Sequence, residues 1–162
     1  MDLATSFGVV SRQTLVSQSG LDFLRGIIER RHPAPPISEA TNIMITSVED
    51  GRVVFRGVPS ERFFNPLGTV HGGWTATILD SAMGCAVHSI VPAGKGYTTI
   101  EMKVHYVRPV LPSSEELVCE GTVIHRGTTI ATAEGRLVDS RGRLLAHGTE
   151  TCFIFEANER AA

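Results

Sequence analysis

The segment that most constrains the fold is residues 72–91, GGWTATILDSAMGCAVHSIV, where Asp80 alone interrupts a long apolar run with a charge. Two glycines open this segment, and Pro92 with the AGKG sequence after it predicts its end. A run of this length fits either a membrane span or a helix at the centre of a protein. Asp80, His88 and several Thr and Ser residues favour the buried core helix. A carboxylate in such a helix requires a partner or a function.

The sequence on either side of this helix has two different periodicities. Upstream, apolar residues that follow Ser19 recur at helical spacing and predict a helix that ends before Pro33. Asp50-Gly51 then lies between two β-prone runs, which is a strong hairpin signal. Downstream of the long helix the pattern changes to period two. The strands predicted there cover residues 97–106, 116–126, 128–138 and 143–155.

The predicted order is one helix, two strands, the long helix and four strands. This order indicates an α+β fold, in which an antiparallel sheet curls around one largely buried helix. The 162 residues suggest one domain. We expect residues 1–35 to form an N-terminal extension with a helix, and residues 36–158 to form the main domain.

Composition disfavours several classes of function. The formal net charge is −2, so nothing points to a nucleic acid or an anionic membrane as partner. Cys85, Cys119 and Cys152 lie far apart without a CxxC motif, which argues against a disulfide framework or zinc site and fits the reducing cytoplasm. The N-terminus lacks the pattern of a signal peptide. The six histidines have no convincing metal-ligand spacing, and no G-x-S-x-G, H-E-x-x-H or P-loop motif occurs.

The helix face that carries Asp80 is small and polar. At about 100° per residue, one stripe of the helix contains Gly73, Thr77, Asp80, Gly84 and His88. The small residues leave room for another group beside Asp80. Two interpretations stay open: a structural acid that satisfies nearby backbone or hydroxyl groups, and a functional acid.

The start of the helix adds a second candidate group. Gly72 and Gly73 lie where backbone N–H groups have no partner within the helix. The partial positive charge of a helix N-terminus favours an anion, and the missing side chain of Gly72 lets a substrate oxygen approach its N–H closely. This combination suits an oxyanion hole for acyl transfer. The alternative is that the glycines serve only the geometry of helix entry.

The spacing of Gly72 and Asp80 leads to a prediction about assembly. They are eight residues apart, which is about 12 Å along a helix. A base that activates water and an N–H group that binds the carbonyl oxygen must lie near the same carbonyl carbon. If both serve one reaction, they come from different subunits. Two such helices packed antiparallel predict a homodimer with two shared sites, and we expect a dimer of dimers as the larger assembly.

Residues 65–80, NPLGTVHGGWTATILD, resemble the helix-entry motif of the hotdog-fold acyl-CoA thioesterases. The closest resemblance is to the phenylacetate-degradation type, in the 4-hydroxybenzoyl-CoA thioesterase superfamily, and it covers residues 36–156. It implies a hotdog fold, acyl-CoA as substrate, and no cofactor beyond the CoA that the substrate carries.

The resemblance also implies roles for individual residues. Asp80 is the nucleophile or general base, and the Gly72 N–H polarises the thioester carbonyl. Asn65 orients water or the acyl group, and Thr99 assists across the site, although relatives often carry serine there. His71 belongs to the motif, and we interpret it mainly as positioning the loop.

Further residues are candidates for substrate contacts, although each also fits an ordinary core or surface role. The candidates for the acyl pocket are Phe63, Phe64, Gly73, Trp74 and Met83. The candidates for the CoA phosphates are Lys103, Arg108 and Arg126.

Hydrolysis is the reaction we expect, because a thiol with a pKa of about 8.5 leaves without a strong general acid. A hotdog hydratase or dehydratase is an alternative, but its usual Asp/His pairing is not visible. A non-catalytic acyl-CoA-binding protein is another, since it would use the same cleft. The acyl group stays open among aryl-acetyl, benzoyl-type and medium-chain groups.

Overall fold

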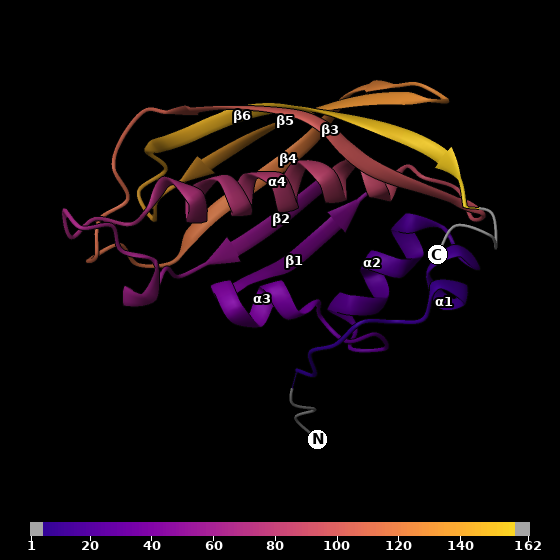
Figure 1. Ribbon diagram of the computed structural model, residues 1–162, viewed down its shortest axis with the longest axis horizontal. Coiled ribbons are helices and arrows are strands. Elements are labelled where there is room, and N and C mark those ends of the chain that lie inside the picture. Colours follow the sequence, from indigo (N-terminus) through magenta and orange to yellow (C-terminus); the bar gives the residue numbers. More distant parts are fainter. Residues whose placement is uncertain (1–4, 158–162) are drawn as a thin grey trace.

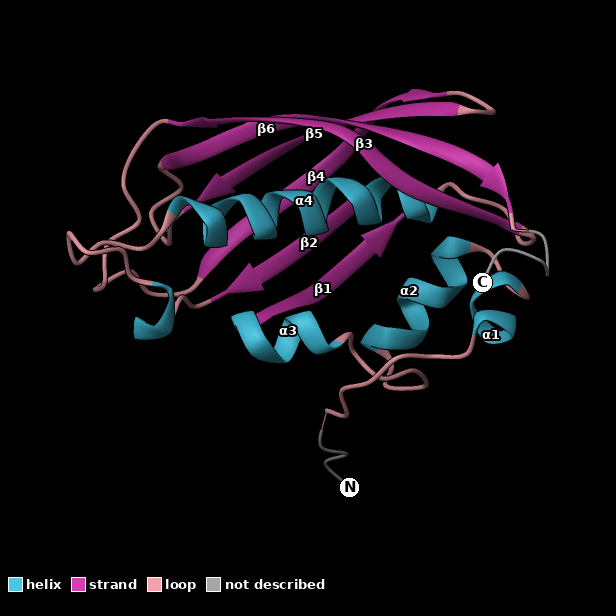
Figure 2. Cartoon of the chain, in the orientation of Figure 1, coloured by secondary structure: helices cyan, strands magenta, loops and turns pink. Residues whose placement is uncertain are grey.

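Helix α4 (Gly72–Ser89) lies against one face of an antiparallel sheet in the computed structural model, which describes residues 5–157 (Figure 1). Within these residues the strand order is β1-β2-β4-β5-β6-β3, so β1 and β3 form the two edges. The strands are β1 (Ile43–Glu49), β2 (Arg52–Gly57), β3 (Lys95–Tyr106), β4 (Leu117–Arg126), β5 (Ile130–Val138) and β6 (Leu144–Glu156). The sheet curves around α4, as Figure 2 shows, and this arrangement confirms the α+β class and the hotdog fold.

The local predictions agree with these elements. Asp50-Gly51 joins β1 to β2, and Gly51 has the positive φ of 83° that such a turn requires. The four downstream strands lie within one or two residues of the predicted ranges. Among the described residues, no helix has the length and apolar character needed to cross a membrane.

The N-terminal segment holds more structure than the single helix expected from the sequence. The expected helix is α2 (Gly20–Ile28), with α1 (Arg12–Val16) before it and α3 (Pro36–Thr41) after it. Both added helices are shorter than two turns, so neither produces a recognisable apolar period. Figure 1 shows α2 and α3 beside β1. The division of the chain at residue 36 stays a prediction, and residues 1–4 and 158 lie outside the described residues.

A row of three glycines lets α4 approach the sheet. Gly121, Gly135 and Gly148 lie directly opposite one another on β4, β5 and β6. A Cβ atom at Gly121 would lie 2.2 Å from the carbonyl oxygen of Ala82 on the helix, and one at Gly135 would lie 2.8 Å from Cγ of Met83. Since neither contact is sterically allowed, the absence of side chains in this row sets the distance between helix and sheet.

The face of α4 opposite the solvent forms the centre of the core. Its buried side chains include Trp74, Ile78, Leu79, Met83 and Val87. The indole Nε1 of Trp74 donates a hydrogen bond to the carbonyl of Thr41 at 2.8 Å, which satisfies its polar atom inside the core. The other face of the helix, which carries Asp80, is open in the single chain.

We expect Gly121→Ala to lower the free energy of unfolding by about 2 kcal/mol or more, because the new methyl group meets helix backbone that cannot move aside. Urea denaturation followed by circular dichroism measures the change. Gly8→Ala is the matched control, since its methyl group would meet Pro33 only at 3.7 Å. Equal stability of the two variants would contradict the close helix–sheet contact.

Candidate active site

The N-terminus of α4 leaves one backbone donor open. The side chain of His71 caps the helix, because its Nδ1 accepts a hydrogen bond from the Gly73 N–H at 2.8 Å. The Trp74 N–H donates to the His71 carbonyl at 3.0 Å. The Gly72 N–H, which precedes these two donors in the chain, has no hydrogen-bond acceptor among the described residues. The cap that His71 provides holds the loop against the helix start, as a loop-positioning role requires. It leaves Gly72 as the free donor.

Gly72 lies in a cleft, close beside the ring of Tyr106. The cleft, about 260 Å³ in volume, is lined by Val70, Gly72, Thr75, Tyr106 and Arg108, with neighbouring backbone. A Cβ atom at Gly72 would come within 3.3 Å of the Tyr106 ring, and the Tyr106 hydroxyl donates a hydrogen bond to the Gly72 carbonyl at 3.2 Å. The Tyr106 hydroxyl therefore holds the Gly72–Gly73 peptide, which directly follows the open Gly72 N–H.

A second cleft lies on the other side of the helix start. It also measures about 260 Å³, and it brings together four of the residues predicted for substrate contacts: Phe63, Phe64, Gly73 and Trp74. Met83 stays apart from them. It is fully buried beneath the sheet, against Gly135 and Gly148, and reaches neither cleft.

Asn65 organises its own loop. Its Oδ1 accepts hydrogen bonds from the N–H groups of Leu67 and Thr69, at 2.9 and 3.2 Å, and its Nδ2 donates to the Thr69 hydroxyl at 2.8 Å. The side-chain acceptor is therefore occupied within the loop. One amide proton remains for a substrate or a water molecule.

The carboxylate of Asp80 is accessible in the single chain, on the face of α4 that the predicted second helix would cover. In the single chain Asp80 is an exposed residue of α4, and its carboxylate makes no hydrogen bond to another described residue. The neighbouring protein still removes enough water to raise the pKa of Asp80 above its ordinary value. An accessible carboxylate without a protein partner is free to act on a substrate or on water.

The buried carboxylate of this region is Glu150, which the sequence interpretation missed. Glu150 is only 1 % exposed, and its Oε2 atom has no hydrogen-bond partner. Burial raises its pKa to about 7, and the negative charge of Asp80 adds to that rise. A signal was present in the sequence: Glu150 falls at an inward position of β6, where the alternate residues are Gly148 and Cys152.

Thr99 connects this buried acid to the open face. Its hydroxyl donates a hydrogen bond to Oε1 of Glu150 at 2.7 Å, and the Cys152 thiol reaches the same oxygen at 3.1 Å. Thr99 itself is exposed, and the β3–β6 register shifts between Thr99 and Glu101. The irregular strand thus presents Thr99 to the solvent on one side and to Glu150 on the other.

Beyond Gly84 the polar stripe of α4 becomes aromatic and neutral. The His88 ring lies between Phe23 and Tyr97, with ring centroids 5.6 and 5.1 Å away. Burial lowers the pKa of His88 to about 4, so the ring is neutral near pH 7. His88 is therefore a packing residue of this stripe.

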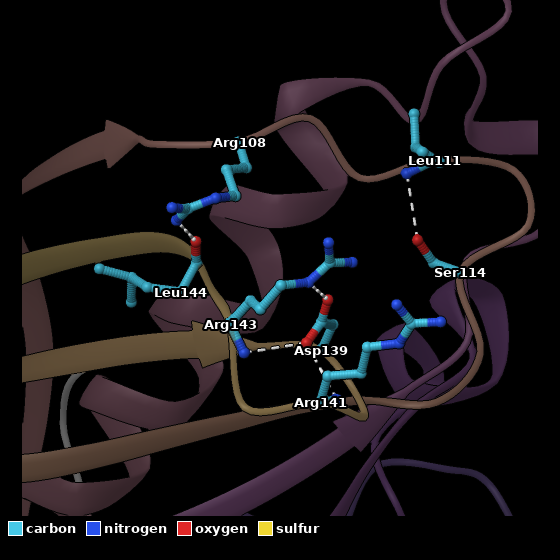
Figure 3. A network of polar contacts seen from close by, with 7 residues as sticks. All are labelled: Arg108, Leu111, Ser114, Asp139, Arg141, Arg143 and Leu144. Carbon is cyan, nitrogen blue, oxygen red and sulfur yellow. Dashed lines mark hydrogen bonds and ion pairs between the residues drawn. The ribbon is translucent and has the colours of Figure 1, made fainter.

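The predicted cations occupy separate places. Arg108 lines the Gly72 cleft and donates to the carbonyl of Leu144 at 2.7 Å. Figure 3 shows it near Arg141 and Arg143, which surround Asp139 and which the sequence interpretation did not single out. Two further predicted cations lie elsewhere: Arg126 pairs with Asp50 at 2.8 Å, and Lys103 is exposed on β3. Of these candidates, only Arg108 lies beside Gly72.

The chain has relatives among known proteins. Residues 67–146 match the family described as the Thioesterase superfamily. A proposed esterase of Halobacterium salinarum is 31% identical over 67% of this chain and 73% of its own length. Acyl-coenzyme A thioesterase 13 of Mus musculus is 29% identical over 67% of this chain and 77% of its own length.

A solved structure shares the fold. It is a proposed thioesterase of Ralstonia eutropha, described as a phenylacetic acid degradation-related protein, and it superposes with a TM-score of 0.74. It covers 81% of this chain and 98% of its own, at 23% identity.

We expect His71→Ala to lower the free energy of unfolding by about 1 kcal/mol, because the Gly73 N–H loses its cap. His71→Asn is the matched control, since asparagine also accepts this hydrogen bond and is a good N-cap residue. Thermal and urea unfolding of the three proteins measure the difference. Two variants that are equally destabilised would show that the cap contributes little.

Proposed function

The chain belongs to the thioesterase superfamily and is a thioester hydrolase, and we propose that its substrates are acyl-coenzyme A thioesters. The observation that carries the proposal is the open Gly72 N–H at the positive end of α4, inside a cleft. A thioester carbonyl placed there gains a donor that is already oriented. The name of the mouse relative, an acyl-coenzyme A thioesterase, supports CoA as the leaving group.

We assign the reacting carboxylate to Asp80 of a second copy of this chain. Gly72 and Asp80 are the first and ninth residues of the straight helix α4, about 12 Å apart along its axis, so one chain does not bring both to one carbonyl. The open face of α4 and the unpaired side of β3 are the surfaces that a partner would cover. The proposed assembly is a homodimer with two shared sites, paired further into a dimer of dimers.

In the proposed reaction the ionised carboxylate of Asp80 accepts a proton from a water molecule whose oxygen bonds to the thioester carbon. The carbonyl oxygen becomes negative and is held by the Gly72 N–H. The C–S bond then breaks, the carboxylic acid is released, and the CoA thiolate takes up the proton that Asp80 holds. Direct attack by Asp80 on the carbon is the alternative first step. Proton transfer from water and direct attack on the carbon both require the ionised carboxylate of Asp80.

The other predicted residues have supporting roles in this scheme. His71 holds the helix entry, and the amide proton left on Asn65 is available to the water or the acyl group. Arg108, beside the Gly72 cleft, is the first candidate for a CoA phosphate, with Arg141 and Arg143 nearby. The cleft of Phe63, Phe64 and Trp74 offers an apolar wall for an acyl group. The free thiols of Cys85, Cys119 and Cys152 fit the reducing cytoplasm as the place of action.

We expect Asp80→Asn to lower kcat on acyl-CoA substrates by about 100-fold or more, since the variant cannot accept a proton. In the wild type, the rate should fall as the pH drops through the raised pKa of Asp80, because protonation removes the active form. Thiol release measured across a panel of phenylacetyl-, benzoyl- and hexanoyl- to dodecanoyl-CoA gives both results. Ser81→Ala, at the next residue of α4 and outside both clefts, is the control for the helix surface.

Equal CoA release by the wild type and Asp80→Asn would contradict the assignment of Asp80. Binding of acyl-CoA without any release would favour the non-catalytic alternative.

A mixed dimer tests the shared site directly. Gly72→Val should be inactive because its side chain meets the Tyr106 ring and blocks the cleft, and Asp80→Asn should be inactive as above. When the two chains are co-expressed with different tags and purified as a mixed dimer, one site contains both an intact Gly72 and an intact Asp80. We therefore expect about half of the wild-type activity per dimer.

The two homodimers, purified from the same cells, serve as controls. A mixed dimer as inactive as they are would show that one chain supplies both residues, as would a fully active monomer in sedimentation at micromolar concentration.

A further inference from the structure

Glu150 is a buried acid that the reaction as described does not use, and its place follows from the glycine row of the sheet. On β6 it is the next inward residue after Gly148, so its side chain points toward α4. A methyl group at Gly84 would lie 3.3 Å from Oε1 of Glu150, which places this oxygen against the helix one turn after Asp80. Glu150 therefore lies between the sheet and α4, one helical turn from Asp80.

The hydrogen bonds of Glu150 determine which way Thr99 can act. The Thr99 hydroxyl has one proton, and it donates that proton to Oε1 of Glu150 at 2.7 Å. The exposed side of the hydroxyl therefore carries only lone pairs, which accept hydrogen bonds. Without Glu150 the hydroxyl would rotate freely and would donate as readily as accept.

We propose that Glu150 is a positioning residue, which holds the Thr99 proton inward so that Thr99 accepts a hydrogen bond from the water that Asp80 activates. The water then has one proton directed to Asp80 and the other to Thr99, which leaves an oxygen lone pair for the thioester carbon. This inference rests on the proposed thioester hydrolysis. Glu150 touches neither water nor substrate and acts through Thr99.

The protonation state of Glu150 affects the direction of the Thr99 hydroxyl, and the groups around Glu150 influence that state. The titratable groups that face it are Asp80 and Cys85 from α4, Tyr97 from β3 and Cys152 from β6. None of them is cationic near neutral pH. A protonated Glu150 can donate its own proton to Thr99 and reverse the hydroxyl, so the inward direction is secured only when Glu150 is ionised.

Four variants separate positioning from packing. Glu150→Leu removes the acceptor, and Thr99→Val removes the hydroxyl. Glu150→Gln keeps an oxygen that accepts from Thr99 but does not titrate, and Thr99→Ser keeps the hydroxyl. Each variant is purified as the full chain, and kcat, KM and the pH dependence of kcat are measured with an acyl-CoA substrate, beside melting temperature and sedimentation.

We expect Glu150→Leu and Thr99→Val each to lower kcat about 10- to 100-fold with little change in KM, since the attacking water is misplaced while substrate binding is kept. The double variant should be no slower than the slower single variant, because both changes remove the same interaction. Glu150→Gln and Thr99→Ser should keep kcat within about threefold of the wild type.

The pH dependence of kcat distinguishes positioning from packing, because a residue that only packs would not change it. Burial raises the pKa of Glu150 to about 7, so the wild type should lose rate as the pH falls through that value. Glu150→Gln should lack this limb and lose rate only at lower pH, where Asp80 is protonated. Between about pH 4.5 and 7 the folded state holds a proton on Glu150 that the unfolded chain releases, so wild-type stability falls as the pH rises through this window and changes little above it. Glu150→Gln should therefore melt above the wild type at pH 8.5, with a smaller difference at pH 5.

Several outcomes would overturn this role. They are an unchanged acid limb in Glu150→Gln, a double variant whose losses multiply, and a Glu150→Leu variant with wild-type kcat per folded enzyme. A Glu150→Leu variant that sediments differently from the wild type would make Glu150 an interface residue instead. Asp80→Asn is assayed in the same series: if it is fully active, the proposed reaction fails, whereas an inactive Asp80→Asn beside additive Glu150 and Thr99 losses rejects only the role of Glu150.

Discussion

The close contact between α4 and the glycine row of β4, β5 and β6 is the constraint on which the rest of the structure depends. With Gly121 under Ala82 and Gly135 under Met83, the helix has one depth and one rotation on the sheet. Because residues on a helix turn by about 100° each, fixing Met83 against the sheet also fixes the direction of Asp80, which lies about 60° from Met83 around the helix axis. Gly84 then faces Glu150 at the β6–β3 side of the sheet. The packing of the core thus determines the direction of the reacting carboxylate.

Sequence periodicity was sufficient to predict the strands, the hairpin at Asp50-Gly51 and the two long helices, because each of these has a period or a turn signal of its own. The short helices α1 and α3 have neither. In the site, Gly72 and His71 were predictable because a helix start is a local feature. Glu150 is close to Asp80 only through the pairing of β3 with β6 and their contact with α4, and such proximity is not visible in one sequence.

Asp80 and Glu150 divide between them two properties that the sequence had suggested for one residue. Asp80 is accessible and has no protein partner, whereas Glu150 is buried and bonded to Thr99. The negative charge of Asp80 adds to the rise of the Glu150 pKa that burial causes. Burial weighs more heavily on Glu150, so as the pH falls the proton binds Glu150 first, and the direction of the Thr99 hydroxyl is lost before Asp80 is protonated.

Fold stability alone does not account for Glu150. A buried oxygen without a partner costs about 1–3 kcal/mol, and a leucine of similar volume would pack against Gly84 without that cost. The acid is also poorly placed to support the fold electrostatically, since no cation faces it among the described residues. What Glu150 does provide is a fixed acceptor for one exposed hydroxyl, at the edge of the helix face that carries Asp80. A destabilising group in such a place is understandable when the direction of that hydroxyl affects the reaction.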